Sequence, residues 1–372
     1  MPLAFLQPVF LDETVHYHPQ QIGGIMDVHS PERGIPNLDE VQIALIGLEN
    51  QPDELMRFRK QWYELYAGNW QWRMVDLGNL IISEQDSDTN YAIKELVAFL
   101  VKRKIIPIFV GGSQRFTYGL YRGFDLLEQM VNMVSIDARF DFTHGGELFS
   151  DHSYMSQILS VPPTNLHDFT NIGYQSYYVA QEELDLMDKM LFEVHRLGNV
   201  SNDISMAEPA LRDADLVSLD MSSVQAKDIN VENGYVNGFS NREICSLARY
   251  AGISNNVQVF GVFDIPATAL AMQLTAQVVW YFCEGCNFRI PELPNTDNAN
   301  YIKHIVLVDD YEIIFYQSRL TNRWWLKAGE DPKSNSNHFP IGLIPCNPSE
   351  YEQAIQGNIP DRWWKSFRKY MM

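Results

Sequence analysis

The stretch KIIPIFVGG, residues 104 to 112, combines a short apolar run with a Gly-Gly turn. Runs of this length, bounded by turn residues and rich in β-branched side chains, are typical of strands buried on both faces. The turn leads directly to Ser113 and Gln114. Because α/β proteins bind ligands at the carboxyl ends of parallel strands, polar residues at such ends are the first candidates for a functional site.

Similar runs recur along the chain, and segments with helical periodicity separate them. The other predicted strands are VQIALIGLE (41–49), VNMVSID (131–137), DLVSLD (215–220) and VQVFGVFD (257–264). The clearest predicted helices cover residues 88–104, 240–252 and 267–282, the second with Ser240 as its cap and Glu243 three residues later. This alternation predicts an α/β fold with a mainly parallel central sheet between two helical layers.

The charge balance excludes several classes of partner. The 372-residue chain has 47 acidic and 28 basic residues, a net charge of -19, which disfavours nucleic acid and anionic membrane surfaces. We find no apolar run near the roughly 20 residues that span a bilayer and no basic leader at the N-terminus, so we expect a cytoplasmic protein. Four cysteines suit a reducing compartment, and Cys283-Xaa-Xaa-Cys286 closes a predicted helix, where a redox or zinc role is not expected.

The chain changes character after residue 287. A Pro/Asn-rich connection precedes YIKHIVLVDDYEIIFYQS, which predicts a β-hairpin turning at Asp309-Asp310. Arg-Trp-Trp then occurs twice, in residues 322–327 and 361–366, either as packing for this extension or as an aromatic binding platform. We therefore expect an N-terminal extension (1–37), a main domain (38–287) and a C-terminal appendage (288–372) packed on it.

Aspartates stand at the ends of two predicted strands. Asp137 and Asp141 follow one, and Asp220 ends another. Carboxylates gathered from separate strands bind hard divalent cations, whereas single aspartates at strand ends also cap the helices that follow. Both interpretations remain open on these residues alone.

The order and spacing of these motifs resemble the ureohydrolase superfamily of arginase, agmatinase and formimidoylglutamase. Its Gly-Gly-Xaa-His loop is similar to residues 111–114, its Asp-Ala-His-Xaa-Asp to 137–141, and its Ser-Xaa-Asp-Xaa-Asp to 218–222. Tyr118-Gly119 looks closer to formimidoylglutamases than to arginases. The resemblance implies a three-layer αβα fold of the arginase type and a site for two manganese ions.

Three of the ligand positions implied by the resemblance carry other residues, namely Gln114, Arg139 and Ser222. One manganese site would retain three of its four ligands, Asp137, Asp141 and Asp220, with Gln114 in place of histidine. The other would retain only Asp137 and Asp220. In the family the two cations acidify a bridging water, and losing one removes most of that effect.

Arg139 is permanently charged and offers no lone pair to a metal. We hypothesise that it forms ion pairs with Asp137 and Asp220 and so replaces the lost cation. Gln114 retains a carbonyl oxygen, which leaves one Mn or Mg possible beside the leading expectation of no metal and the alternative of two ions.

Two further positions correspond to functional residues of the family. His152 lies near a loop histidine that assists proton transfer, although an ordinary surface role fits it equally. Asp264 corresponds roughly to a glutamate that contacts the cationic end of the substrate, and capping of the helix after Pro266 is the competing role.

These residues lead to three hypotheses of function. The first is a ureohydrolase-family protein whose di-manganese site is eroded and which is non-catalytic. The second is a C-N hydrolase of linear amidines, such as formimidoylglutamate, arginine or agmatine, with one divalent cation. The third is a binding or sensor protein for a guanidino or formimino compound. The resemblance also raises the possibility of a homo-oligomer.

Overall fold

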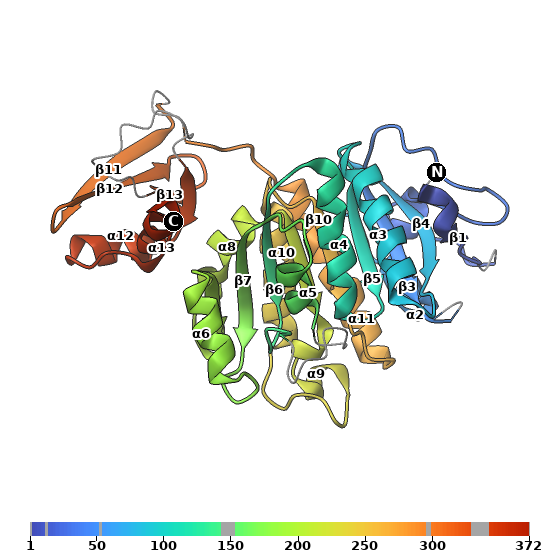
Figure 1. The fold of residues 1–372 in the computed structure, drawn as a ribbon. Coiled ribbons are helices and arrows are strands. Elements are labelled where there is room, and N and C mark those ends of the chain that lie inside the picture. Colours follow the sequence, from blue (N-terminus) through green and yellow to red (C-terminus); the bar gives the residue numbers. More distant parts are fainter. Residues whose placement is uncertain are drawn as a thin grey trace.

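The computed structural model describes residues 2–11, 14–51, 54–142, 153–294, 299–328 and 342–371. A large, mainly parallel sheet lies between two layers of helices, and a smaller unit at the C-terminus lies to one side (Figure 1). The strands of the large sheet, in spatial order, are β1 (Leu6–Gln7), β4 (Arg73–Ile81), β3 (Val41–Glu49), β5 (Ile106–Gly111), β10 (Val259–Phe263), β9 (Leu216–Asp220), β6 (Val131–Ile136), β7 (Leu166–Tyr174) and β8 (Glu193–Arg196). Strand β2 (Asp27–Val28) pairs with β4, and β1 is the antiparallel member.

All five predicted strands are present, within two residues of their expected limits. In this sheet the prediction missed β4, β7 and β8 and the two-residue strands β1 and β2. Strand β7 begins Leu-His-Asp-Phe-Thr-Asn, so its polar residues interrupt the apolar run that marks a buried strand. Asn171 is nevertheless fully buried, and its side chain donates a 2.7 Å hydrogen bond to the carbonyl of Arg139. Its Oδ1 accepts a hydrogen bond from the backbone N–H of Tyr174 at 3.1 Å, so both ends of the buried amide are satisfied.

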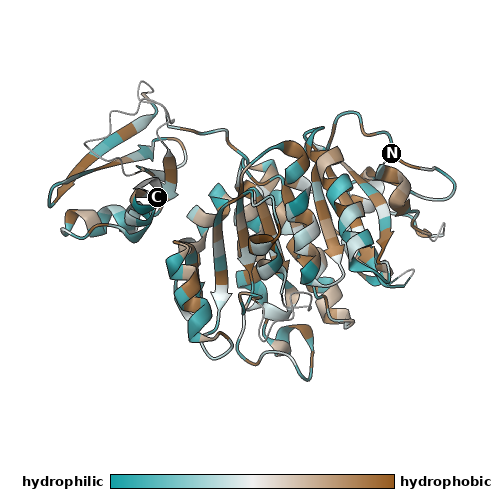
Figure 2. Ribbon diagram, in the orientation of Figure 1, coloured by the Kyte–Doolittle hydropathy of each residue, from teal (hydrophilic) through white to brown (hydrophobic). Residues whose placement is uncertain are grey.

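Helices on opposite faces of the sheet bury two separate apolar clusters. One face is covered by α2 (Met56–Tyr63), α7 (Leu197–Asn202), α8 (Glu208–Asp213), α9 (Ala226–Ile229), α10 (Asn241–Ile253) and α11 (Ala269–Asn287). The other is covered by α3 (Asp86–Val101), α4 (Thr117–Gly123), α5 (Tyr154–Ser160) and α6 (Gln181–Lys189). The short α1 (Ile22–Ile25) contributes Ile22 to the first cluster. Apolar residues accordingly concentrate on the central strands (Figure 2), and the predicted three-layer αβα fold is confirmed.

In the described part of the chain, five short 3-10 turns accompany these helices and strands. They are η1 (Pro2–Phe5), η2 (Gln114–Phe116), η3 (Phe124–Leu127), η4 (Ile204–Ala207) and η5 (Met221–Ser223). Turns η2 and η5 directly follow β5 and β9, so they position residues at the carboxyl edge of the sheet.

The predicted cap of α10 is present in full. The Ser240 hydroxyl accepts a hydrogen bond from the backbone N–H of Glu243, and the Glu243 carboxylate accepts one from the backbone N–H of Ser240 at 2.7 Å. This reciprocal pair satisfies two backbone donors that the first turn of a helix leaves unpaired.

All four cysteines are free and buried. Burial raises the pKa of Cys286 to about 11 and that of Cys283 well above its ordinary value. These thiols are therefore packing residues, and their burial raises the pKa of both.

The C-terminal unit is a four-stranded antiparallel sheet with two helices. Its strands are β11 (Tyr301–Val308), β12 (Tyr311–Ser318), β13 (Trp324–Lys327) and β14 (Leu343–Cys346), and its helices are α12 (Pro348–Ile355) and α13 (Asp361–Met371). The predicted hairpin corresponds to β11 and β12. Trp324 and Trp363 belong to this unit's own apolar core.

The arginines of both Arg-Trp-Trp repeats reach the main domain. Arg362 contacts Glu193 at 2.9 Å, and Arg323 lies 3.7 Å from Glu208. The Arg212 guanidinium of the main domain stands over the Trp325 ring at 4.6 Å. Trp324 and Trp363 thus take part in packing within the appendage, and charged side chains contribute to its attachment.

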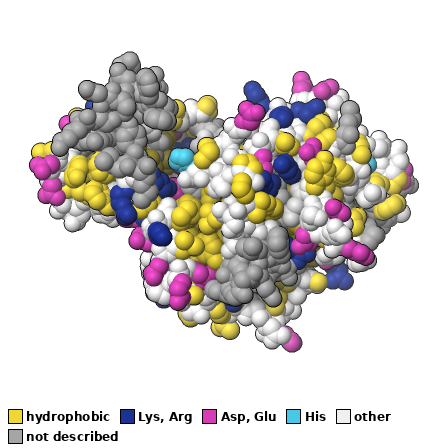
Figure 3. Space-filling view, viewed as in Figure 1, with side chains coloured by type: hydrophobic (Ala, Val, Ile, Leu, Met, Phe, Trp, Pro, Cys, Tyr) yellow, Lys and Arg dark blue, Asp and Glu magenta, His cyan; other side chains and the backbone are white. Residues whose placement is uncertain are grey.

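Among the described residues, no helix is both long and apolar enough to cross a bilayer. On the face shown in Figure 3, lysine and arginine side chains are interspersed with acidic and hydrophobic ones.

Candidate functional site

Four neighbouring strands bring the candidate residues to one edge of the sheet. The order β5, β10, β9, β6 places Gln114, Asp264, Asp220 and the pair Asp137 and Asp141 side by side after the strand ends. Gln114, Asp137, Asp141 and Asp220 are all buried. The structure therefore assembles residues up to 150 positions apart in the sequence, as the parallel arrangement predicts.

The side-chain amide of Gln114 points into the carboxylate cluster. In the orientation that satisfies both of its ends, Nε2 donates to Asp137 Oδ2 at 3.0 Å and to Asp141 Oδ2 at 3.2 Å. Oε1 then accepts hydrogen bonds from the hydroxyls of Ser135 at 3.1 Å and Ser218 at 3.3 Å. The amide thus presents hydrogens, not its carbonyl oxygen, to the carboxylates.

A layer of hydroxyl groups lies beneath Gln114 and was not predicted. Tyr154 donates to Ser135 Oγ at 3.0 Å, and Thr117 Oγ1 lies 2.6 Å from Ser218 Oγ. The sequence could have predicted the two serines. Each lies two residues before a strand-end aspartate, and residues two apart in a strand point to the same face. Tyr154 and Thr117 come from helices, and no local pattern marked them.

Ser222 binds Asp220 directly. Its backbone N–H donates to Asp220 Oδ1 at 2.7 Å, and its hydroxyl donates to Oδ2 at 2.6 Å. Asp220 therefore caps the turn η5 as well as belonging to the cluster. The two interpretations of strand-end aspartates, cap and cluster member, both hold for this residue.

Arg139 does not form the ion pairs expected from the sequence. Its Nε donates to the Tyr235 hydroxyl at 2.9 Å, and its guanidinium carbon lies 5.1 Å from the centre of the Tyr178 ring. The salt bridges within the described part of the chain include none between Arg139 and Asp137 or Asp220. Only the backbone N–H of Arg139 reaches Asp137, at 3.1 Å. The hypothesis of an internal cation between these carboxylates was wrong because two tyrosines hold the guanidinium instead.

Burial dominates the electrostatics of the aspartates. It raises the pKa of Asp137 well above its ordinary value, and the charges of Asp141 and Asp220 raise it further. Burial and then the charge of Asp264 raise the pKa of Asp220 to about 8. Clustered carboxylates of this kind are stabilised by protons, cations or hydrogen-bond donors.

The side chains at the three altered ligand positions determine whether metal ions fit the site. Gln114 and Ser222 direct hydrogens at carboxylate oxygens that would otherwise face a cation, and Arg139 has no lone pair. The portions of the chain that the structure describes contain no group of three or more His, Cys, Asp or Glu side chains arranged to hold a metal ion. This donor set does not fit two cations.

Asp264 is held at the site by the loop that follows strand β5 and contains Gly112 and Gln114. Its Oδ2 accepts a 2.7 Å hydrogen bond from the backbone N–H of Gln114, and its own N–H donates to the carbonyl of Gly112. The cap of α11 is Thr268 rather than Asp264, so the competing role as a helix cap is not found. Asp141 and Asp264 both have positive φ, at 56° and 49°, a backbone state that often accompanies functional sites. His152 lies outside the described residues.

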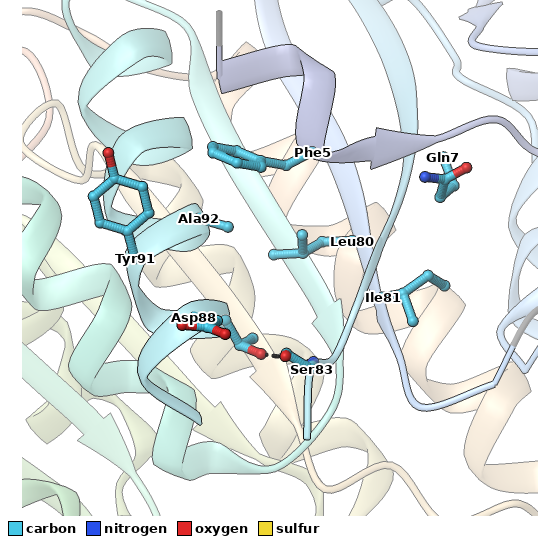
Figure 4. A pocket seen from close by; sticks show the side chains of 9 residues that line it. Phe5, Gln7, Leu80, Ile81, Ser83, Asp88, Tyr91 and Ala92 are labelled. Atoms are coloured by element: carbon cyan, nitrogen blue, oxygen red, sulfur yellow. Dashed lines mark hydrogen bonds between the residues drawn. The ribbon is translucent and has the colours of Figure 1, made fainter. Parts of the chain in front are cut away.

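Two surface hollows have lining residues that the structure describes. One, of about 410 Å³, opens beside the site and is lined by Gly111, Gly112 and Asp264 together with Glu54 and Arg115. The other, of about 430 Å³, lies between the N-terminal segment and α3 (Figure 4). There Phe5 and Gln7 face Leu80 and Tyr91, and none of the strand-end residues takes part.

A family model described as Arginase family matches residues 41–268. A curated protein of Methanothermus fervidus, named an uncharacterized 32.2 kDa protein, is 27% identical over 154 residues, which are 37% of this chain and 53% of that protein. The chain thus spans about half the length of this curated relative.

Solved structures show the same fold at low sequence identity. A formiminoglutamase of Trypanosoma cruzi, crystallised with Mn²⁺, superposes with a TM-score of 0.63 and 13% identity over 73% of this chain and 99% of its own. For a formimidoylglutamase of Bacillus subtilis the TM-score is 0.63 at 12% identity, over 76% and 95% of the two chains. For an agmatine ureohydrolase of Thermoplasma volcanium it is 0.57 at 17% identity, over 72% and 94%.

Proposed function

This chain belongs to the arginase family, and from that premise we propose that it is a ureohydrolase-type protein whose strand-end site works without two manganese ions and does not hydrolyse amidines. The observation that carries the proposal is the buried amide of Gln114, which stands where the family resemblance places a metal-binding histidine and which, in the orientation that satisfies both of its ends, donates to Asp137 and Asp141. The hydroxyl of Ser222 does the same for Asp220.

The physical basis is the cost of unpaired charge. Buried carboxylates are unfavourable unless cations, protons or hydrogen-bond donors compensate them. Three positions that hold metal ligands in the family carry other residues here. Gln114 and Ser222 donate hydrogen bonds to the carboxylates, and Arg139 is a cation held by two tyrosines. A ureohydrolase needs two cations to acidify its attacking water, and such donors occupy the oxygen atoms that would hold them.

A second candidate is a C-N hydrolase of linear amidines with one Mn or Mg. The convergence of Asp137, Asp141 and Asp220 supports it, because three carboxylates can hold one hard cation. To offer Oε1 to a cation, Gln114 would have to place Nε2 on the hydroxyls of Ser135 and Ser218, and this orientation forgoes the hydrogen bonds to Asp137 and Asp141 that satisfy both ends of the amide. We therefore place this candidate second.

Metal analysis and activity assays test the proposal together. Protein purified with manganese should contain less than one equivalent of the ion, and it should release no urea, ammonia or formamide from arginine, agmatine or formimidoylglutamate. The triple variant Gln114→His, Arg139→His, Ser222→Asp restores the ligand types and should bind manganese. Gln181→His, on the surface helix α6, is the matched control and should leave the metal content unchanged.

Two stoichiometric manganese ions in the unaltered protein, or turnover of any of the three compounds, would contradict the proposal. One ion with turnover would favour the second candidate.

A further inference from the structure

Arg139 stands in a cradle formed by two tyrosines. Its Nε donates to the Tyr235 hydroxyl at 2.9 Å, and its guanidinium lies over the Tyr178 ring. The two tyrosine rings contact each other, with centres 4.6 Å apart and an angle of 33° between their planes. We call Arg139, Tyr178 and Tyr235 the tyrosine cradle. A guanidinium that is stacked and hydrogen-bonded in this way has little rotational freedom left.

The backbone beneath the cradle is also held. The carbonyl of Arg139 accepts a 2.7 Å hydrogen bond from Asn171, and its N–H donates to Asp137 at 3.1 Å. The rim is linked as well, because Gln175 Nε2 donates to the Asn237 carbonyl at 2.9 Å and Asn237 Nδ2 donates to the Tyr177 hydroxyl at 3.0 Å. The cradle is thus pre-organised from both sides, which reduces the entropy lost when a ligand binds.

Among the described residues, the outer edge of the guanidinium has no hydrogen-bond partner. Of the hydrogen bonds and ion pairs that the described residues make, none uses Nη1 or Nη2 of Arg139. The side chain is half-buried and borders solvent. Two Nη groups in one plane match the spacing of two carboxylate oxygens and bind them through paired, charge-assisted hydrogen bonds.

We propose that the tyrosine cradle is a binding subsite for a small, planar monocarboxylate, with Arg139 as its anchor and the rings of Tyr178 and Tyr235 as the surface for its body. The inference rests on the proposed function, because it needs a site in which no cation takes the place of Arg139. This ligand is an anion, whereas the carboxylate cluster alone would attract a cation.

The surrounding charges limit the ligand to a monoanion. The cradle has one guanidinium, and the carboxylates of Asp137 and Asp141 lie close enough to interact with it electrostatically. A phosphate dianion would meet one positive charge and at least two acidic groups, whereas a carboxylate has a single, delocalised charge. The aromatic rings favour a flat body over a branched aliphatic one.

Benzoate and benzamidine form a matched pair of probes, because both are flat and of similar size but of opposite charge. Calorimetric titration in the presence of EDTA should show benzoate binding at least tenfold more tightly than benzamidine. Arg139→Gln should weaken benzoate binding at least tenfold, and Arg139→Lys should weaken it severalfold, because it retains the charge but loses the planar fork. Tyr178→Phe retains the ring and should change the affinity less than twofold.

Tighter binding of benzamidine, an Arg139→Gln variant that binds benzoate as tightly as the unaltered protein does, or no binding of benzoate at millimolar concentration would overturn the subsite. If Arg139→Gln does not fold, Arg139→Lys and Tyr235→Phe give the same discrimination. The two proposals fail differently. Manganese uptake by the unaltered protein would contradict the proposed function. Benzoate binding that depends on added manganese would contradict the subsite.

Discussion

At the level of single residues, a glutamine amide and a metal-binding imidazole need different partners. A metal-binding histidine offers a lone pair, whereas the amide of Gln114 offers hydrogens to the same two carboxylates. The substitution is accommodated because Ser135 and Ser218 supply hydroxyls to the other end of the amide. With glutamine in place of histidine, both ends of the Gln114 side chain therefore have hydrogen-bond partners.

A second buried network joins strand β4 to helix α2. Asp76 accepts hydrogen bonds from Arg59 Nε at 2.8 Å, from the Tyr63 hydroxyl at 2.7 Å and from the Gly78 N–H at 2.8 Å. We predict that Asp76→Asn lowers the free energy of unfolding by about 3 to 5 kcal/mol, because it leaves a buried arginine without its main counter-charge. Urea unfolding followed by circular dichroism measures this change.

Asp27→Asn is the matched control for that prediction. It removes one carboxylate from an exposed pair with Arg73 at 2.6 Å, and exposed pairs contribute about 1 kcal/mol or less. Similar losses for the two variants would show that the buried network contributes no more than a surface pair.

At the scale of the element, strand ends and helix starts follow local rules. The Ser240 cap of α10 satisfies two backbone donors, and we predict that Ser240→Ala costs about 1 kcal/mol of stability. The mid-helix Ser246, whose hydroxyl donates to the Arg242 carbonyl, is the control, and its replacement by alanine should change stability by about 0.5 kcal/mol or less. Chemical denaturation of both variants checks the difference, and equal costs would remove the assigned role of the cap.

Two of the longer strands that escaped prediction, β4 and β7, share one property. Their polar residues are paired by neighbours from distant segments, as Asn171 is by Arg139 and Asp76 is by Arg59. Hydrophobic periodicity detects elements that bury apolar faces and does not detect elements whose buried polar groups are satisfied by tertiary contacts.

At the scale of the whole molecule, the C-terminal unit covers the edge of the large sheet. Helix α13 contacts β8 and the residues around it through three charged side chains: Arg362 to Glu193, Lys365 to the carbonyl of Phe192, and Lys369 to Asp168. An uncovered edge strand invites pairing with other chains, so this cover protects β8.

Acid should weaken that attachment. Burial alone would raise the pKa of Glu193, but the charge of Arg362 and the adjacent His195 lower it to about 2, against an ordinary 4.5. A lowered folded-state pKa contributes stability that is fully present above about pH 4.5 and is lost as the pH falls through about 2. We predict that Glu193→Gln flattens the decline of unfolding free energy within this window.

Denaturant titrations at a series of pH values measure that decline, and Glu182→Gln on the surface of α6 serves as the control. A Glu193→Gln protein with the same acid slope as the unaltered one would show that the ion pair does not couple attachment to pH.

Local patterns in the sequence were enough to predict the αβα class, the five central strands, the cap of α10 and the gathering of Gln114, Asp137, Asp141 and Asp220 at one edge. These features depend on local periodicity and on the common direction of parallel strands. The direction of the Arg139 side chain could not be predicted in this way. From the sequence it faced the carboxylates, and in the fold it turns to Tyr178 and Tyr235, which lie 39 and 96 positions later. Side-chain direction at such a site depends on long-range partners, and no local pattern identifies them.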